Sequence, residues 1–334
     1  MMKSKYLPGF FLLVCYLCRL NVYAVEWSTA AAENGDSRAQ YELGICFTKG
    51  EGVPKDLNKA IEWWTRCAKQ EGQYALESQY ELGQACAKGE GVSMDLKKAA
   101  EWWNKAAEKG HALSQYMLGK CYAKGDGLLK DIVKAREWWE KSAEQECGYA
   151  MIELGKCLAN GEGVAKDKAK AMEWWKKASK QQAANKQAQD LLGTSYLNEA
   201  IFFKQRGDKK AAADRFFISA NYGNAEAQYE IGQCCNIGDG TEKSRDKAAK
   251  WWFKAAERKN AKAYIALGFY YNENPGVGSY QRKAYIYILL AQRGGEDVGK
   301  KLDEYGKKIN PRVDFYQKRS DLELRNELGL IDPK

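Results

Sequence analysis

One two-part phrase recurs along the chain and constrains the fold more than any other feature. Its first part is a leucine or isoleucine followed by glycine, repeated every 36 to 39 residues. These copies begin at Leu43, Leu82, Leu118, Leu154, Leu192, Ile231 and Leu267. Its second part is a large apolar pair, placed three residues after a small one. The pairs begin at Trp63, Trp102, Trp138, Trp174, Phe216, Trp251 and Tyr287, after Ala60, Ala99, Ala135, Ala171, Ala213, Ala248 and Ala284. Such a period is typical of stacked repeats.

The stretch from Ala112 to Ala143 shows what one repeat contains. Apolar residues at helical spacing end in a Gly-Asp-Gly break, and a second periodic run carries its small and aromatic residues at i, i+3, i+4, i+7 and i+8. Asp131 stands between them where an N-cap belongs, because its side chain can accept a bond from an unpaired backbone amide. The predicted caps are Asp56, Asp95, Asp131, Asp167 and Asp246. The repeat is therefore a helix, a loop and a second helix, with both tryptophans expected in the core.

The loop residues carry a family resemblance. Gly50-Glu-Gly-Val53, Gly89-Glu-Gly-Val92 and Gly161-Glu-Gly-Val164 resemble the loop of the Sel1-like repeat, a relative of the tetratricopeptide repeat. The resemblance covers roughly residues 25 to 295. It implies an all-α fold, a right-handed α/α superhelical solenoid of about seven helix pairs with helical caps. Repeat five lacks the Gly-x-Gly loop, so its first helix is expected to be longer and to turn at Gly207.

The predicted boundaries follow this repeat register. They are 1–24 for a signal peptide, 25–38 for an N-terminal half-repeat cap, 39–295 for the repeats and 296–334 for a C-terminal cap. The repeats are placed at about 39–74, 75–111, 112–147, 148–184, 185–223, 224–260 and 261–295. The C-terminal cap is expected to hold two amphipathic helices, the second over Val313–Leu328.

The first 24 residues resemble an export signal. Lys3 and Lys5 precede an apolar run from Phe10 to Cys18, which is too short to span a membrane, and Ala24 ends a small-residue cleavage pattern. We therefore expect a secreted or periplasmic protein that is not an integral membrane protein, with a lipoprotein modified at Cys15 as the lesser alternative.

The charge is mildly basic. Lys and Arg number 53 against 44 acidic residues, and loss of the leader's Lys3, Lys5 and Arg19 would leave 50 against 44. This balance is consistent with an acidic protein or peptide partner, and also with an ordinary solvated surface. No basic tract with interleaved aromatics is present, so no nucleic-acid partner is expected, and the protein is expected to be a monomer.

The cysteines leave two interpretations open. Eight cysteines follow the leader, an even number that is compatible with disulfides in an exported protein. A bridge between the helices of one repeat, Cys46 to Cys67, is one prediction. The other is that the cysteines are small buried residues at alanine-like positions. Their spacing and the single histidine, His111, do not predict a metal site, and no cofactor is expected.

The sequence offers little for catalysis. His111 is expected to be a solvated loop residue, and it is the only histidine that could serve as a base. Ser244-Arg-Asp-Lys247 matches a Ser-x-x-Lys motif but is expected at a helix cap, without the companion motifs. We therefore expect no enzyme. The resemblance also implies one alternative, a cysteine-rich hydrolase that binds or cleaves β-lactams. A third hypothesis is a scaffold associated with cell-wall polysaccharide.

The first helices supply the predicted binding face. By the same resemblance, they line the concave side of the solenoid and point selected tyrosines and lysines into it. Tyrosines beside ammonium groups would suit an acidic protein segment or a free carboxylate. The alternative is that the tyrosines pack in the wall and the lysines are solvated. The predicted protein-binding residues are Tyr41, Lys49, Tyr80, Lys88, Tyr116, Lys120, Lys124 and Lys156.

Overall fold

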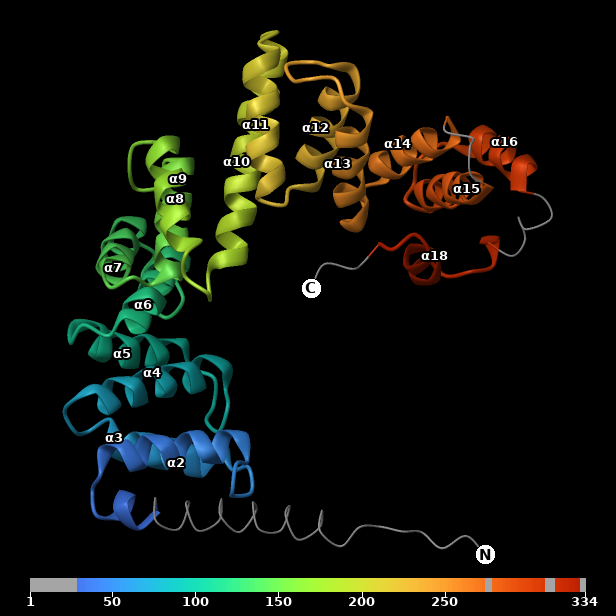
Figure 1. Ribbon diagram of the computed structural model, residues 1–334. Coiled ribbons are helices and arrows are strands. Elements are labelled where there is room, and N and C mark those ends of the chain that lie inside the picture. Colours follow the sequence, from blue (N-terminus) through green and yellow to red (C-terminus); the bar gives the residue numbers. More distant parts are fainter. Residues whose placement is uncertain (1–28, 274–277, 310–315, 331–334) are drawn as a thin grey trace, which may run out of the picture. The chain divides into compact units, whose positions relative to one another are not determined.

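The chain folds into paired helices. The computed structural model describes residues 29–273, 278–309 and 316–330, and every regular element within them is a helix. The described residues form two compact units, one up to Asn185 and one from Lys186 (Figure 1). The predicted all-α solenoid of helix pairs is confirmed. The predicted leader, residues 1–24, lies outside the described residues.

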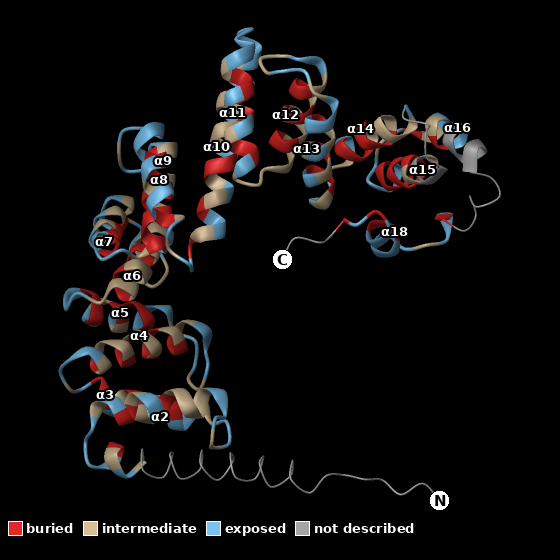
Figure 2. Cartoon of the chain, viewed as in Figure 1, coloured by how far each residue is buried: buried red, intermediate tan, exposed pale blue. Residues whose placement is uncertain are grey.

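The first unit stacks four regular helix pairs, coloured blue to green in Figure 1. Each helix packs against the next along the chain. The buried residues lie mainly where the two helices of a pair meet (Figure 2). The pairs are α2 (Ser37–Lys49) with α3 (Leu57–Cys67), α4 (Gln73–Lys88) with α5 (Leu96–Glu108), α6 (Ala112–Lys124) with α7 (Ile132–Glu144), and α8 (Gly148–Asn160) with α9 (Lys168–Ala178).

The loop between paired helices is built by capping residues. Gly125 ends α6 in the left-handed conformation, at φ 83°. A side chain on Gly127 would lie 2.2 Å from the Leu96 carbonyl oxygen of the preceding pair, so this position also requires glycine. Asp131 then accepts a bond from the Lys134 amide at 3.0 Å and begins α7. The predicted cap at Asp246 is wrong, because Ser244 lies four residues before the small residue and caps that helix instead. The confirmed aspartate caps are Asp56, Asp95, Asp131 and Asp167.

The recurring glycine makes room for the second tryptophan of each pair. A side chain on Gly119 would lie 2.4 Å from the indole nitrogen of Trp139. The indole therefore lies flat on α6, and its Nε1 donates to the Tyr116 carbonyl at 3.1 Å. The same bond joins Trp64 to Tyr41, Trp103 to Tyr80 and Trp175 to Ile152.

The expectation that both tryptophans of each pair are core residues is wrong for the first one. Trp139 is 3% exposed, whereas Trp138 is half-buried and carries the Lys141 ammonium 4.3 Å from its ring centroid. On a helix, adjacent residues point about 100° apart, so only one of two neighbours can face the partner helix directly. The half-buried members are Trp63, Trp102, Trp138, Trp174 and Trp251.

A buried glutamine joins successive repeats. Gln115, on α6, is 4% exposed and donates through Nε2 to the Ala107 carbonyl at the end of α5, at 3.1 Å. The bond pairs a helix-end carbonyl that would otherwise be unsatisfied. Gln40, Gln79 and Gln228 make the equivalent bonds.

The second unit contains three further pairs and a C-terminal segment. Its elements are α10 (Asn185–Gln205), α11 (Lys209–Asn221), α12 (Ala225–Ile237), α13 (Arg245–Glu257), α14 (Ala261–Asn272), α15 (Gly278–Arg293), α16 (Gly299–Ile309) and α18 (Asp321–Glu327). As predicted, α10 is long and the chain turns at Gly207, where φ is 79°. Residues 313–315 of the predicted second cap helix lie outside the described residues, and its later part forms the seven-residue helix α18.

Repeat five pairs its helices in a different register from the others. Phe216 is the buried ring, at 1% exposure, and Phe217 is 48% exposed, so the buried member is the first of the pair. The small residue four positions before the buried ring is therefore Ala212 and not Ala213, which corrects the predicted alignment. The Ser219 hydroxyl donates to the Gly193 carbonyl at 2.6 Å. A side chain on Gly193 would meet nothing closer than 3.4 Å.

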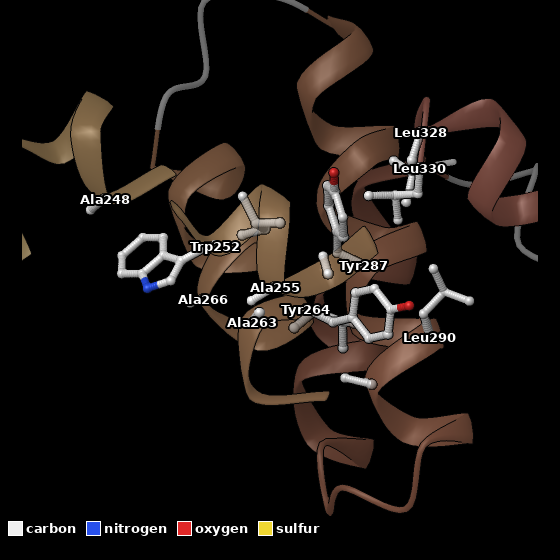
Figure 3. Close-up of a cluster of buried hydrophobic side chains, with 14 of the residues drawn as sticks. Ala248, Trp252, Ala255, Ala263, Tyr264, Ala266, Tyr287, Leu290, Leu328 and Leu330 are labelled. Atoms are coloured by element: carbon white, nitrogen blue, oxygen red, sulfur yellow. The ribbon is translucent and has the colours of Figure 1, made fainter. Parts of the chain in front are cut away.

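The end of the second unit is covered by the C-terminal segment. Helix α15 is buried continuously from Ala284 to Ala291. Leu328 and Leu330 join the buried cluster that contains Tyr264 and Tyr287 (Figure 3). Tyr264 occupies the position of the joining glutamine, and Arg325 of α18 bonds to its hydroxyl and donates to the Ala256 carbonyl at 3.0 Å. Arg325 of the C-terminal segment thus makes the bond to the helix-end carbonyl that a glutamine makes in other repeats.

Candidate protein-binding grooves

The predicted tyrosines lie half-buried on the first helices of the first unit. Their rings also pair with the next repeat, since Tyr116 stacks on Tyr149 with centroids 5.6 Å apart and Tyr41 lies 5.9 Å from Tyr74. Burial raises the pKa of Tyr41 and Tyr116 to about 12, which keeps their phenols protonated at neutral pH. These tyrosines are both part of the wall and available as hydrogen-bond donors.

Four of the eight predicted residues line one groove. A groove of about 680 Å³, here called the α6–α8 groove, lies between α6, α7 and α8. Its predicted members are Tyr116, Lys120, Lys124 and Lys156, and Lys130, Glu153 and Glu162 also line it. The Lys120 ammonium lies 5.4 Å from the Tyr116 ring centroid, which is cation–π geometry.

Two exposed lysines of the α6–α8 groove are not neutralised. Lys156 bonds to Glu153 at 2.9 Å, and Glu162 accepts a bond from Asn160. Lys124 and Lys130 are exposed and form no ion pair within the part of the chain that the structure describes. The groove therefore offers two free ammonium groups beside an aromatic wall, an arrangement suited to carboxylates.

A second groove lies nearer the N-terminal end of the first unit. It has a volume of about 250 Å³, lies between α2, α3 and α4, and is here called the α2–α4 groove. Tyr80 and Lys88 from the predicted set line it. Sequence reasoning missed two of its polar members, Glu81 and Gln84, although both follow Tyr80 on one face of α4.

The remaining predicted residues are not brought into either groove. Lys49 is exposed and lies 3.9 Å from Glu51 within its own loop. Tyr41 lies at the start of the stack beside Tyr74. Lys88, which does line the α2–α4 groove, is likewise paired, at 3.9 Å from Glu90. Exposed pairs of this kind contribute little to stability or recognition.

His111 is not the solvated residue that was expected. Its side chain is 12% exposed, and it caps α6 by accepting the Ser114 amide on Nδ1 at 3.3 Å. With Nδ1 as acceptor, Nε2 carries the proton, and it lies 3.4 Å from Glu77. The hydrogen bond with His111 lowers the pKa of Glu77. His111 therefore joins α4 to α6.

The predicted Cys46–Cys67 bridge is wrong for this structure. Both are free thiols, and Cys67 Sγ donates to the Ser37 carbonyl at 3.2 Å, at the start of α2. Cys46 lies nine residues further along the same helix, or about 13 Å, which exceeds the span of a disulfide. Burial raises the pKa of the Cys121, Cys157 and Cys234 thiols to about 11, so they are poor nucleophiles.

The Ser244 motif is used for structure. Ser244 accepts the Lys247 amide at 3.3 Å as the α13 cap, and the Lys247 ammonium bonds to Glu242 at 2.7 Å. Lys247 is therefore not positioned to act as a base toward Ser244. Among the described residues, no group of three or more His, Cys, Asp or Glu could hold a metal ion, and no helix has the length and apolarity to cross a membrane.

The comparisons with known proteins agree with this repeat geometry. The Sel1 repeat model matches more than half of the chain, at residues 21–36, 37–71, 76–111, 112–147, 148–182 and 225–260. The crystal structure of a Sel1 repeat protein from Oxalobacter formigenes is 30% identical, has a TM-score of 0.54, and the match covers 74% of this chain and 72% of that chain. The structure of a protective antigen of uropathogenic Escherichia coli with an SLR fold is 25% identical, with a TM-score of 0.49, covering 94% and 73%.

Shorter matches join the chain to curated proteins. The rat DAP3-binding cell death enhancer 1 is 39% identical over 54 residues, which are 16% of this chain and 11% of that protein. A putative sel1-like repeat-containing protein L18 of Acanthamoeba polyphaga mimivirus is 46% identical over 46 residues, 14% of this chain and 8% of that protein. The aligned segments thus span about a tenth of each relative. From its repeat matches and its helix pairs, the chain belongs to the Sel1 repeat family.

Proposed function

We propose that this Sel1 repeat scaffold binds an acidic segment of a partner protein in the α6–α8 groove. The observation that carries the proposal is that Lys124 and Lys130, which form no ion pair within the described residues, line the same groove as the Tyr116 ring. Carboxylates of the partner would bond to these ammonium groups, while its apolar atoms would lie against Tyr116 and Ile132. Binding of this kind needs no catalytic group.

We also propose that the protein acts outside the cytoplasm. The support is the leader pattern at residues 1–24, which ends where the half-repeat register begins. The hydrolase alternative has no support from Ser244, whose hydroxyl caps α13. The polysaccharide-bound scaffold stays a prediction.

A random 16-residue peptide library displayed on phage tests the binding proposal without a known partner. Selection on the full chain should enrich peptides with clustered Asp and Glu. A synthetic copy of the most enriched peptide should bind at least about tenfold more weakly to Lys124→Glu/Lys130→Glu, because two attractive contacts become repulsive.

The matched control is Lys97→Glu/Lys168→Glu, which makes the same charge change at exposed positions outside the groove. Equal loss of binding in both double variants would mean that only net charge matters. Enriched peptides without an excess of acidic residues would also overturn the proposal.

A further inference from the structure

The two grooves are equivalent places in the repeat, and their differences are informative. Counting from the leucine of each Leu-Gly phrase, Glu81 of the α2–α4 groove matches Glu153 of the α6–α8 groove. In the same way Gln84 matches Lys156. One carboxylate position is therefore present in both grooves, with a different residue one helical turn later.

That later residue decides whether the carboxylate has a cation. In the α6–α8 groove, the Lys156 ammonium bonds to Glu153 at 2.9 Å. In the α2–α4 groove, Gln84 takes the place of the lysine and instead donates to the Tyr80 hydroxyl at 2.7 Å. Within the described residues, Glu81 has no ion pair or hydrogen bond of its own. The groove thus holds a carboxylate at a position where the molecule itself shows an ammonium can bind.

The surroundings of Glu81 do not compensate for the missing cation. Glu81 is half-buried, and its burial, together with the like charge of Glu77, raises its pKa. Lys88 and His111 act in the opposite direction, but Lys88 lies beside Glu90 and His111 beside Glu77. A partly desolvated carboxylate of this kind gains more from an incoming cation than an exposed one does.

We propose that the α2–α4 groove receives a lysine or arginine side chain of the partner, between Glu81 and the Tyr80 ring. This inference rests on the proposed function, because the basic side chain belongs to the same segment whose acidic residues lie in the α6–α8 groove. The two grooves lie two repeats apart along the first unit, because Glu81 is on α4 and Glu153 is on α8.

The peptide selection also tests this inference. Enriched peptides should carry Lys or Arg at a constant separation from their acidic cluster. Glu81→Gln should lower the affinity for the best peptide about fivefold. When the basic residue of that peptide is changed to Gln, the peptide should bind the wild-type chain and the Glu81→Gln chain with equal affinity. Glu62→Gln, an exposed change on α3, is the matched control and should have no effect. Thermal melting checks that each variant is folded.

The outcomes separate this inference from the proposed function. The inference would be overturned if the enriched acidic peptides carried no basic residue at a constant position. It would also be overturned if the basic residue still raised the affinity of the peptide for Glu81→Gln. Either outcome would leave the proposed function standing. Peptides that are not acidic would overturn the proposed function. If such peptides were basic and lost affinity in Glu81→Gln, the α2–α4 groove would still be a cation site.

Discussion

The third and fifth repeats carry the same Leu-Gly phrase, yet they use it differently. In the α6–α7 pair, the Ser142 hydroxyl donates to the Ala112 carbonyl, six residues before the leucine. In the α10–α11 pair, Ser219 donates to Gly193, one residue after the leucine. The second helix is therefore displaced by seven residues, about two helical turns, along the longer α10.

The Leu-Gly phrase therefore marks a repeat, but it does not determine how the second helix is aligned along the first. In repeat three, glycine is required because the Trp139 indole lies against the backbone. In repeat five, no ring approaches Gly193, and the missing Gly-x-Gly loop lets α10 continue to Gln205. Register follows the loop and the buried ring. Four sets of variants test this difference between the two repeats.

The largest effect is expected from removing the buried rings. Trp139→Ala should cost about 3–5 kcal/mol, and Trp138→Ala under about 1 kcal/mol. In repeat five the order reverses, with Phe216→Ala the costly change and Phe217→Ala the mild one. Urea denaturation followed by circular dichroism measures each. Similar costs for Phe216→Ala and Phe217→Ala would contradict the register of α11.

The next largest difference is expected between the stability effects of replacing Gly119 and Gly193. Gly119→Ala is expected to cost about 3 kcal/mol, because the new methyl overlaps the buried Trp139 indole. Gly193→Ala should be neutral or stabilise by up to about 1 kcal/mol through helix propensity. Hydrogen exchange of α6 and α10 amides reports each pair separately, since repeats contact only their neighbours. A destabilising Gly193→Ala would reveal a close contact that the structure does not have.

The bonds between repeats are the third point of comparison. Arg325→Met should cost about 2 kcal/mol, because it leaves the Ala256 and Glu257 carbonyls without a charged donor. Gln115→Met removes one neutral bond and should cost about 1 kcal/mol. Lys318→Met, at an exposed position of the same segment, is the control. The comparison would fail if Arg325→Met and Lys318→Met gave equal melting temperatures.

The smallest effect concerns pH. Glu77 has a folded pKa below its ordinary 4.5, through its bond to His111. Its contribution to stability is therefore present above pH 4.5 and lost as the pH falls through the folded pKa. Glu77→Gln should lower stability at pH 7 by under about 1 kcal/mol, and the difference should disappear in acid. In the second unit Asn224 caps α12 and makes no bond to a carboxylate within the described residues, so Asn224→Ala should show no such pH dependence.

Much of the fold was predictable because it depends on local rules. Aspartate caps, glycine C-caps and 3.6-residue periodicity act within a few residues, so they identify the helix pairs. The offset of α11 was not predictable, because adjacent Phe216 and Phe217 satisfy the pattern equally and packing against α10 chooses between them. The Ser244 cap, in contrast, was predictable, because serine and aspartate cap helices about equally well and only Ser244 keeps the four-residue spacing to Ala248.

The candidate site was predictable in part. The tyrosine and lysine positions followed from the repeat register, and four of them line one groove. The role of His111 was not predictable, because its partner Glu77 is 34 residues earlier in the chain. The free carboxylate of Glu81 depends on Gln84 bonding to Tyr80, a choice of partner that spacing alone does not reveal.

The Arg325 contact has a consequence for the order of folding during synthesis. It joins residues 69 and 61 positions apart, whereas the other pairs in the array form between neighbours. Local pairs can fold as the chain emerges, but long-range contacts raise the contact order and must wait. The last helix pair is therefore expected to remain unfinished on the ribosome until α18 emerges, while the first unit can already be folded.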